Sequence, residues 1–585
     1  CWNVCSSTPS ALVRSRRSSV SINAAGDNRN NMLIDGMDNN ERAIGTIVVR
    51  PSIDAIAEVR VQTSNYPAEV GRTAGGVVNI LTKAGSNTLH GTAYSFCRDD
   101  RFDSRDYFAT VDPLLKQKQF GGSIGGPLVR DRTFYFADYE GFRSRQGQVN
   151  LLTVPTARMR SGDFSEVPTL IYDPSTRQPF PGNVIPANRI DPIAARFLAL
   201  YPDPTSPGLA NNYSSTTLRT QNSTTADARI DHRFSDTNSM WGRYSINDSR
   251  TVTPPGCPPV NGIHGNCLTG TNAGFPGPND TDAQAVQVNF VRIFSPSMVG
   301  EFKGGYMKVG IFSYPSNYQT NVSQQFGLNG VNIDDLASGL ALQNIVGFAL
   351  LGDTQNIPLI TRNWTQQYNA SITKTTGAHN IKFGGGVILR KFSVIQSQQP
   401  NGLWTYNNLV TRNAAGAGGN AMASFLLGLP SQVQRSHTPF EPFYHVQEPS
   451  LYVQDDWRAR SWLTLNLGLR YDVFTPFTEE EDRLSNLDLT TPRVLVAGRD
   501  GASRTAGVST DYGNIGPRFG FAATLPRTSV LRGGYGLTYF PSTIASFAYM
   551  KNAPLFSIYG PVISDATLLG GVPTVFLRDG LPPQP

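Results

Sequence analysis

The chain is poor in charge and has no long apolar run. Only 16% of its 585 residues are charged, against about 25% in an ordinary soluble domain, while 39% are hydrophobic and Gly, Tyr and Phe are abundant. This balance excludes a helical or disordered protein and favours β structure with long polar loops. No stretch of about 18 apolar residues occurs, which excludes a transmembrane helix but not a membrane strand, whose apolar residues alternate with polar ones.

Cysteine is also scarce, with five in the chain. Cys257 and Cys267 lie in one segment rich in Gly, Pro and Asn, which predicts a disulfide-closed loop in an oxidising compartment. A metal site is the rival interpretation, but His264 alone adds little to two thiols. We expect Cys97 to be a small buried residue.

Catalytic motifs are absent from the sequence. Its six histidines are mostly isolated, and no nucleophile or nucleotide-binding motif stands between a strand and a helix. Asp455 and Asp456 are neighbours on a predicted strand, so their carboxylates point to opposite faces. The net charge is +6, but Lys and Arg are scattered rather than gathered in a patch. The sequence therefore predicts a protein that is not an enzyme, with no catalytic residue, cofactor, metal site or nucleic-acid partner.

Residues 463–473 alternate without a break between apolar and polar side chains. Leu467 and Leu469 share one parity with the other apolar residues, and Asn466 and Arg470 share the other. Successive side chains of a strand point to opposite faces, so this segment has one apolar and one polar face. About 10 residues in this pattern are typical of a strand that crosses an outer membrane.

The alternation recurs in hairpins with short turns. Long segments without sustained alternation separate the hairpins: residues 145–220, 248–281, 313–361 and 476–513. Short turns on one side and long loops on the other are typical of an outer-membrane barrel. The rival is a soluble sandwich, but lipid covers the apolar face of every strand at once. One helix is predicted in a loop, at residues 191–200, where Asp191 would cap it and Pro192 would be its first residue.

The first 85 residues have a different pattern. Short apolar runs separated by Asn, Asp and Gly predict a small α/β domain with a few short strands. A short helix is expected at residues 52–58, after Pro51.

Several segments resemble a known family. Three of them, in order and spacing, resemble the plug domain of TonB-dependent outer-membrane receptors: residues 33–37, 52–60 and 68–83. Others resemble the Oar-like branch of that family: residues 85–91, 154–164, 423–430 and 452–457.

The resemblance implies a mainly β fold, a transmembrane antiparallel β-barrel with the small α/β plug domain in its lumen. Residues 1–85 would be the plug, truncated at its N-terminus, and residues 86–585 the barrel, truncated at its C-terminus. The family's barrel has about 22 strands, whereas about 14 to 16 strand candidates are visible here. We therefore expect a fragment whose TonB box and last strand lie outside the sequence.

The resemblance also implies function. It predicts energy-coupled uptake across the outer membrane of a bulky extracellular ligand, such as a siderophore, cobalamin, an oligosaccharide or a peptide. The TonB–ExbB–ExbD complex would act through the missing N-terminal TonB box, and outer-membrane lipid would surround the wall. The alternative is a surface-adhesion or protein-export barrel on the same scaffold. A TonB box upstream would favour transport.

Two groups of candidate site residues follow. The plug motif comprises Asp35, Gly36, Glu69, Gly71, Arg72, Gly75, Gly76 and Asn79. The lumen-facing candidates, which would contact the plug or line the lumen, are Arg229, Arg243, Arg470, Arg518 and Arg532. For each arginine, a solvated lumen charge without a specific partner is an equal alternative.

Overall fold

The computed structural model describes residues 22, 29–41, 45, 47–63, 66–104, 113–269, 275–526, 529–541, 558–564 and 575–581. In this part of the chain no helix is both long and apolar enough to cross a membrane.

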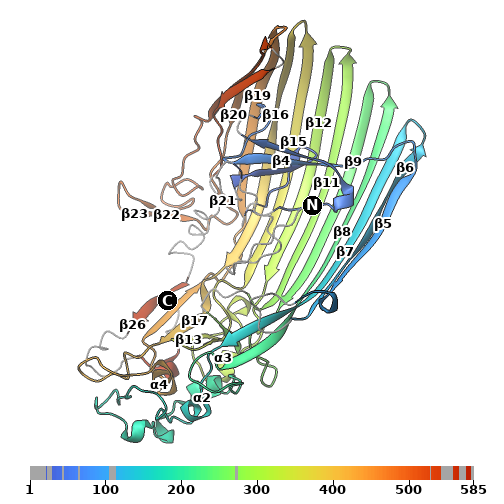
Figure 1. Cartoon of the computed structure of the whole chain (residues 1–585). Helices are drawn as coiled ribbons and strands as arrows, with labels where there is room; N and C mark the ends of the chain where they lie inside the picture. Colours follow the sequence, from blue (N-terminus) through green and yellow to red (C-terminus); the bar gives the residue numbers. More distant parts are fainter. Residues whose placement is uncertain are drawn as a thin grey trace.

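A curved antiparallel sheet of 14 strands forms the wall of the molecule (Figure 1). Thirteen of its strands follow one another in chain order: β5 (His90–Asp99), β6 (Leu115–Val129), β7 (Thr133–Leu152), β8 (Tyr213–Ser235), β9 (Asn238–Thr253), β11 (Gly277–Ser295), β12 (Met298–Ser313), β15 (Leu359–Thr376), β16 (His379–Gln396), β19 (Tyr444–Arg460), β20 (Leu463–Asp472), β24 (Ile515–Thr524) and β25 (Val530–Gly536). The last is β21 (Thr478–Glu479), which pairs beside β19. Within the described residues β5 and β25 are the two ends of the sheet and do not pair.

The alternation seen in the sequence sets the two faces of this wall. In β20, Leu467 and Leu469 are exposed on the convex face, whereas Arg470 and Asp472 are buried on the concave one. Leu467 lies directly opposite Phe519 of β24, so apolar side chains form continuous rows across strands. The predicted parity of this strand is confirmed.

A small four-stranded sheet lies on the concave side of the wall (Figure 1). Its strand order is β2–β1–β4–β3, and the strands are β1 (Asn31–Ile34), β2 (Met37–Asp38), β3 (Ile56–Thr63) and β4 (Gly76–Thr82). The helix expected at residues 52–58 is wrong. Only Ile53–Ala55 form a 3-10 turn, capped by the Ser52 hydroxyl, because the residues after it alternate and pair with β4 as strand β3.

The long connections do not remain irregular, as the sequence predicted, but fold together at the end of the wall opposite the short turns (Figure 1). We call this body the cap; it comprises described residues of 153–212, 254–276, 314–358, 397–443, 558–564 and 575–581. Its six-stranded sheet has the order β10–β14–β13–β17–β18–β26: β10 (Asn266–Leu268), β14 (Leu350–Leu351), β13 (Leu342–Ile345), β17 (Gln399–Tyr406), β18 (Gln432–His437) and β26 (Ile558–Ser564).

Short helices complete the cap. They are α1 (Ala157–Arg160), α2 (Pro192–Leu198), α3 (Val322–Gln325) and α4 (Ala421–Leu426), with 3-10 turns at Pro181–Asn183, Ala187–Arg189, Asp335–Ala337 and Leu577–Asp579. A further 3-10 turn, Asp100–Phe102, follows β5, and a hairpin of β22 (Ser485–Asp488) and β23 (Arg493–Val496) lies between β20 and β24. Helix α2 is the helix predicted in a loop: the Asp191 carboxylate accepts hydrogen bonds from the N–H groups of Ile193 and Ala194.

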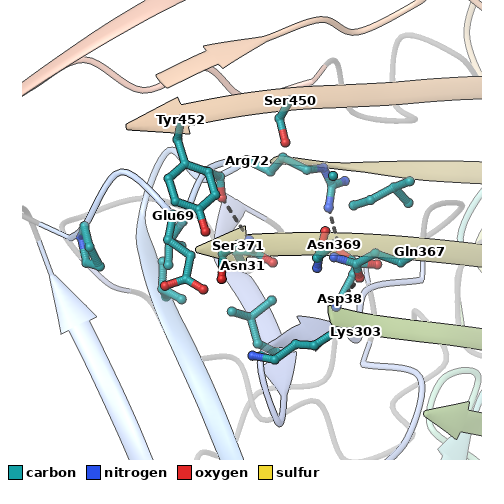
Figure 2. A pocket seen from close by; sticks show the side chains of 18 of the residues that line it. Asn31, Asp38, Glu69, Arg72, Lys303, Gln367, Asn369, Ser371, Ser450 and Tyr452 are labelled. Carbon is teal, nitrogen blue, oxygen red and sulfur yellow. Dashed lines mark hydrogen bonds and ion pairs between the residues drawn. The ribbon is translucent and has the colours of Figure 1, made fainter. Parts of the chain in front are cut away.

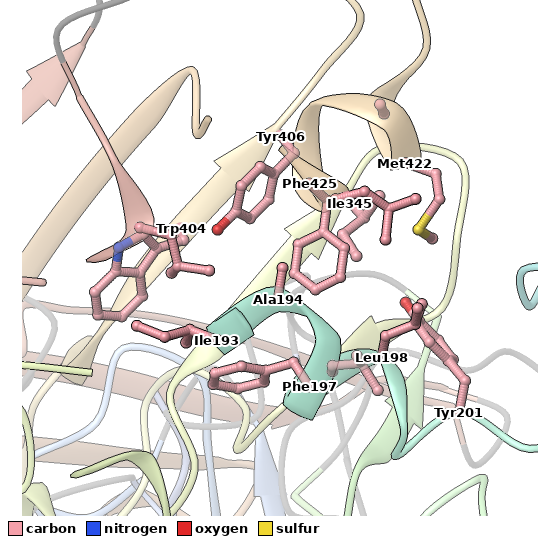
Figure 3. Packing of buried hydrophobic residues seen from close by; sticks show 14 of the residues in the cluster. Ile193, Ala194, Phe197, Leu198, Tyr201, Ile345, Trp404, Tyr406, Met422 and Phe425 are labelled. Atoms are coloured by element: carbon pink, nitrogen blue, oxygen red, sulfur yellow. The ribbon is translucent and has the colours of Figure 1, made fainter. Parts of the chain in front are cut away.

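An apolar core holds the cap together (Figure 3). Phe197 of α2, Phe425 of α4 and Trp404 of β17 are completely buried in it. The phenyl ring of Phe425 packs edge-on against Tyr406 with centroids 5.1 Å apart. Buried aromatic side chains from two connections, 153–212 and 397–443, pack with buried aliphatic side chains from the other connections. This shared core explains why these segments, which show no periodicity, form a defined body.

Covalent and polar links join the connections. Cys257 and Cys267, the predicted pair, form a disulfide. The buried Asp353 carboxylate accepts hydrogen bonds from the side-chain amides of Asn266 and Asn317, each 3.0 Å away, and so joins two different connections. The expectation for Cys97 is wrong: its side chain is exposed, because β5 ends the sheet and has no second neighbour among the described strands.

The predicted loop bounds also need correction. β7 continues to Leu152 and β8 starts at Tyr213, so the first connection is shorter than the predicted range 145–220. The connection between β16 and β19, residues 397–443, is not among the predicted long loops. It contains β17, α4 and β18, whose short apolar runs resemble those of the wall strands.

Candidate functional site

The interface between the small sheet and the wall gathers most of the motif residues. Asp35 and Gly36 form the turn between β1 and β2, both with positive φ (49° and 80°). Gly36 donates its N–H to the side-chain oxygen of Asn79 at 3.0 Å, and Asp35 accepts from the N–H and the hydroxyl of Thr82 at 2.9 and 2.8 Å. Its second carboxylate contact is with the wall, where the Arg243 guanidinium of β9 lies 2.6 Å away.

A second group of buried charges joins the sheet to β16 and β19. We call Asp38, Arg72, Arg390 and Glu448 the four-charge cluster. Asp38 is 2.6 Å from Arg72 and 2.9 Å from Arg390; Glu448 is 2.5 Å from Arg72 and 3.4 Å from Arg390. All four side chains are at most 9% exposed. Two acids and two bases alternate, so the cluster is neutral although it is buried.

The environment of Asp38 shows how this balance works. Burial raises the pKa of its carboxyl, but the positive charges of Arg390 and Arg72 outweigh burial and lower the pKa from 3.8 to about 2. The carboxylate is therefore ionised at neutral pH and both arginines keep a partner.

A third set of contacts lies on the loop between β3 and β4. The Glu69 carboxylate is 2.5 Å from the Lys382 ammonium of β16. Arg470 of β20 donates to the carbonyl oxygens of Ala68 and Glu69 at 3.2 and 2.9 Å. A Cβ at Gly71 would lie 2.3 Å from Nε of Arg470, so only glycine lets the arginine approach this closely.

The predicted arginines divide into four that reach the small sheet or its loops and one that does not. Arg518 donates to the carbonyl oxygen of Tyr66 at 3.1 Å, and Arg229 donates to the Thr82 hydroxyl at 3.3 Å. Arg532 is exposed on β25 and makes no hydrogen bond or ion pair with the described part of the small sheet. It lies near the end of the wall, farther along the sheet than Arg518.

Two motif glycines act within the small sheet itself. Gly75 donates its N–H to the Thr73 hydroxyl at 3.1 Å. A Cβ at Gly76 would lie 2.5 Å from the side chain of Ile22, so close packing of the segment before β1 requires glycine there. Both of these contacts are with residues of the N-terminal part of the chain and not with the wall strands.

One apolar patch supplements the polar contacts. Ile34, Val48 and Val49 of the small sheet and its loops pack against wall residues of β11 and β12 such as Ala285 and Met307. Arg518 also lies over the Tyr66 ring, with its guanidinium carbon 5.2 Å from the ring centre. The contacts described above are hydrogen bonds and ion pairs.

A cavity of about 380 Å³ remains between the small sheet and the wall (Figure 2). Its lining is polar: Asn31 and Glu69 come from the small sheet and its loop, and Gln367, Ser371 and Tyr452 come from the wall. Figure 2 shows the sheet residues facing the wall residues across this space.

Four participants were missed by sequence reasoning: Asp38, Lys382, Arg390 and Glu448. Asp38 lies two residues beyond the Asp35-Gly36 pair, and Arg390 and Glu448 occupy lumen-facing positions of long strands. The available signal was a charged residue at a strand position whose side chain points into the lumen. This signal does not show which of the lumen charges will contact the small sheet.

Comparison with known proteins places the chain. It belongs to the family of the outer membrane beta-barrel domain, whose model matches residues 81–585. It is thus a protein of a Gram-negative-type outer membrane, and its fold is that of a barrel wall with the small N-terminal sheet as a plug on its lumen side.

Particular relatives are consistent with this family. The chain is 30% identical over 128 residues to the TonB-dependent transporter Oar of Myxococcus xanthus, which is 20% of this chain and 12% of Oar. It is similar in structure to the outer membrane transporter YddB of Escherichia coli, with a TM-score of 0.50 and 11% identity over 92% of this chain and 57% of YddB. The siderophore receptor PirA of Acinetobacter baumannii has a TM-score of 0.42 and 11% identity, over 88% of this chain and 68% of PirA.

Proposed function

We propose that this chain is the plug and part of the barrel of a TonB-dependent receptor that imports a bulky substrate across the outer membrane. Residues 1–85 are the plug domain and residues 86–585 belong to the barrel in this proposal. The likeness to Oar, a TonB-dependent transporter by name, supports it over 128 residues.

The observation that carries the proposal is the nature of the contact between plug and wall. Arg243, Lys382, Arg390 and Arg470 hold the plug from three different strands, β9, β16 and β20, through ion pairs and hydrogen bonds. Polar contacts exchange for water at low net cost when two surfaces separate, whereas a large apolar core does not. A plug held this way is seated in one position and is still removable by a pulling force.

The cap supports the same function. It stands at the end of the wall opposite the short turns (Figure 1), which is the extracellular end of an outer-membrane barrel. A folded body of this kind offers a shaped surface for a siderophore, cobalamin, an oligosaccharide or a peptide. The TonB–ExbB–ExbD complex would supply the force through a TonB box.

Uptake measurements test the proposal. We would delete the complete gene in its host and measure uptake of four labelled probes: a ferric siderophore, cobalamin, a malto-oligosaccharide and a hexapeptide. The proposal predicts that uptake of one probe falls at least tenfold, returns with the complete gene, and falls again when TonB is removed. Unchanged uptake of all four together with lost attachment of cells to surfaces would favour the adhesion alternative.

A further inference from the structure

The convex face of the wall has one marked hollow. It has a volume of about 490 Å³ and crosses β11, β12, β15, β16 and β19 near the short-turn end. Phe302, Phe383 and Leu451 line it and are 46%, 58% and 57% exposed. The neighbouring residues of opposite parity, such as Lys382 beside Phe383 and Tyr452 beside Leu451, face the plug cavity, so the hollow faces lipid. We call it the outer hollow.

Small residues create the outer hollow. Gly300, Ala370 and Gly385 lie on three successive strands, where Gly300 is paired with Ile372 and Ala370 with Gly385. A Cβ at Gly300 would lie 2.7 Å from the ring of Phe294. A Cβ at Gly385 would likewise lie 2.6 Å from Cδ2 of Leu451. The glycines thus let Phe294 and Leu451 lie close to the sheet, where they wall a depression the size of a short hydrocarbon segment.

Two cations stand at the rim of the outer hollow. Arg292 lines it, with its guanidinium carbon 5.3 Å from the centre of the Phe294 ring. Lys374 lies on β15, two residues beyond Ile372 of the hollow and nearer the short turns. Its ammonium donates to the Ser297 hydroxyl at 2.7 Å. Neither cation has an acidic partner among the described side chains. The acid among the lining residues, Glu301, has its own partner, the Lys303 ammonium 3.2 Å away.

The position fixes which lipid layer the hollow meets. The turn that joins β11 to β12 comprises residues 296–297 and is one of the short turns, which lie on the periplasmic side of an outer-membrane barrel. Arg292 is three residues from the end of β11, where a cation sits at headgroup level at little cost.

We propose that the outer hollow binds one anionic glycerophospholipid of the periplasmic leaflet. An acyl chain fills the depression over Ala370, between Phe302, Phe383 and Leu451, and Arg292 and Lys374 bind the phosphate. The apolar walls of the hollow give an acyl chain more van der Waals contact than the convex barrel surface around it does. The two cations beside the hollow, which have no acidic partner among the described side chains, favour a negatively charged headgroup. This inference depends on the outer-membrane location and not on transport.

Native mass spectrometry of the complete protein tests the proposal. The protein would be released from micelles that contain phosphatidylglycerol and phosphatidylethanolamine in equal amounts. We expect the native protein to retain one phosphatidylglycerol. Ala370→Phe, which fills the hollow, should lower that occupancy at least fivefold. The matched control is Ala228→Phe, because Ala228 is an exposed alanine of the same face on β8, and it should leave occupancy unchanged.

A second variant tests the headgroup contact independently of the hollow. Arg292→Gln should abolish the preference for phosphatidylglycerol over phosphatidylethanolamine. Arg460→Gln should preserve it, because Arg460 is an exposed arginine at the short-turn end that is paired with Leu463 and lies outside the hollow. Equal occupancy in Ala370→Phe and Ala228→Phe would overturn the proposal, and so would a native protein that retains no lipid or shows no preference that depends on Arg292. The heat-dependent migration of the barrel in gels verifies that each variant is folded.

Discussion

Single charged side chains decide how the plug meets the wall. The four-charge cluster is neutral only while all its members are present. In each of its ion pairs, both the acid and the base are almost completely buried. Removing one member leaves a buried charge without a partner, which is much more costly than never having the pair.

Asp38→Asn should therefore loosen the plug. The variant leaves Arg72 and Arg390 with Glu448 alone, and we expect a loss of about 3–5 kcal/mol in the stability of plug docking. Hydrogen exchange of β3 and β4 in urea measures it. Glu58→Gln is the matched control, because its ion pair with Arg60 is exposed and contributes little. Equal exchange in the two variants would contradict the role of the cluster.

The Asp38 carboxyl also determines how far the pH can fall before the plug loses its docking stability. The pKa of Asp38 in the folded protein is about 2, below its ordinary 3.8, through the charges of Arg390 and Arg72 that outweigh burial. A depressed acid pKa contributes stability that is fully present above the unfolded value and lost as the pH falls through the folded value. Exchange protection of β4 should hold at neutral pH and decline between pH 3.8 and about 2. Loss of protection near pH 6 would show that another group controls docking.

Along a wall strand, alternate residues face two different environments, the lipid and the lumen. Leu467→Lys places a charge on the lipid-facing side of β20 and should cost about 2–4 kcal/mol near the bilayer midplane. Asn466→Lys points to the lumen, where Asp456 lies 2.7 Å from the native amide, and should be mild. Folding free energies of the complete barrel in lipid vesicles measure both. Similar costs for the two variants would contradict the assignment of faces.

The disulfide belongs to the scale of the loop. It closes a segment with a sequence separation of 10 residues, for which the chain-entropy account gives about 2–3 kcal/mol. Replacing Cys257 and Cys267 by Ser should raise hydrogen exchange in residues 254–269 and leave the wall strands unchanged. Faster exchange throughout the cap would mean instead that this link holds the whole cap together.

Elements differed in how far the sequence could predict them. Strands such as β20 were predictable because period-two alternation is local and one face is lipid. The segment after Pro51 predicts a longer helix than the 3-10 turn at Ile53–Ala55, because the pairing of the next residues with β4 is not visible in the local sequence. The strands of the cap, such as β17, were not predicted because their pairing is set by distant segments and not by periodicity.

The whole molecule combines a wall, a plug and a cap with different kinds of stabilisation. Lipid covers the wall, an apolar core holds the cap, and charges seat the plug. Arg243 and Arg470 were predicted as lumen residues by parity, and the structure supplies their partners on the plug. Asp38, Arg390 and Glu448 come together from distant parts of the chain, so only the folded arrangement reveals the four-charge cluster.

The most direct test of this arrangement is a cross-link between plug and wall. A Cβ at Gly468 of β20 would lie 3.0 Å from the Cβ of Ala68, close to the separation in a disulfide, about 3.5–4.5 Å. In the complete protein, Ala68→Cys with Gly468→Cys should oxidise to one linked pair of peptides, detected by mass spectrometry. Ala68→Cys with Leu467→Cys, whose second thiol faces lipid, should stay reduced. Free thiols in the first pair, or linkage in both, would contradict a plug seated on the lumen face of this wall.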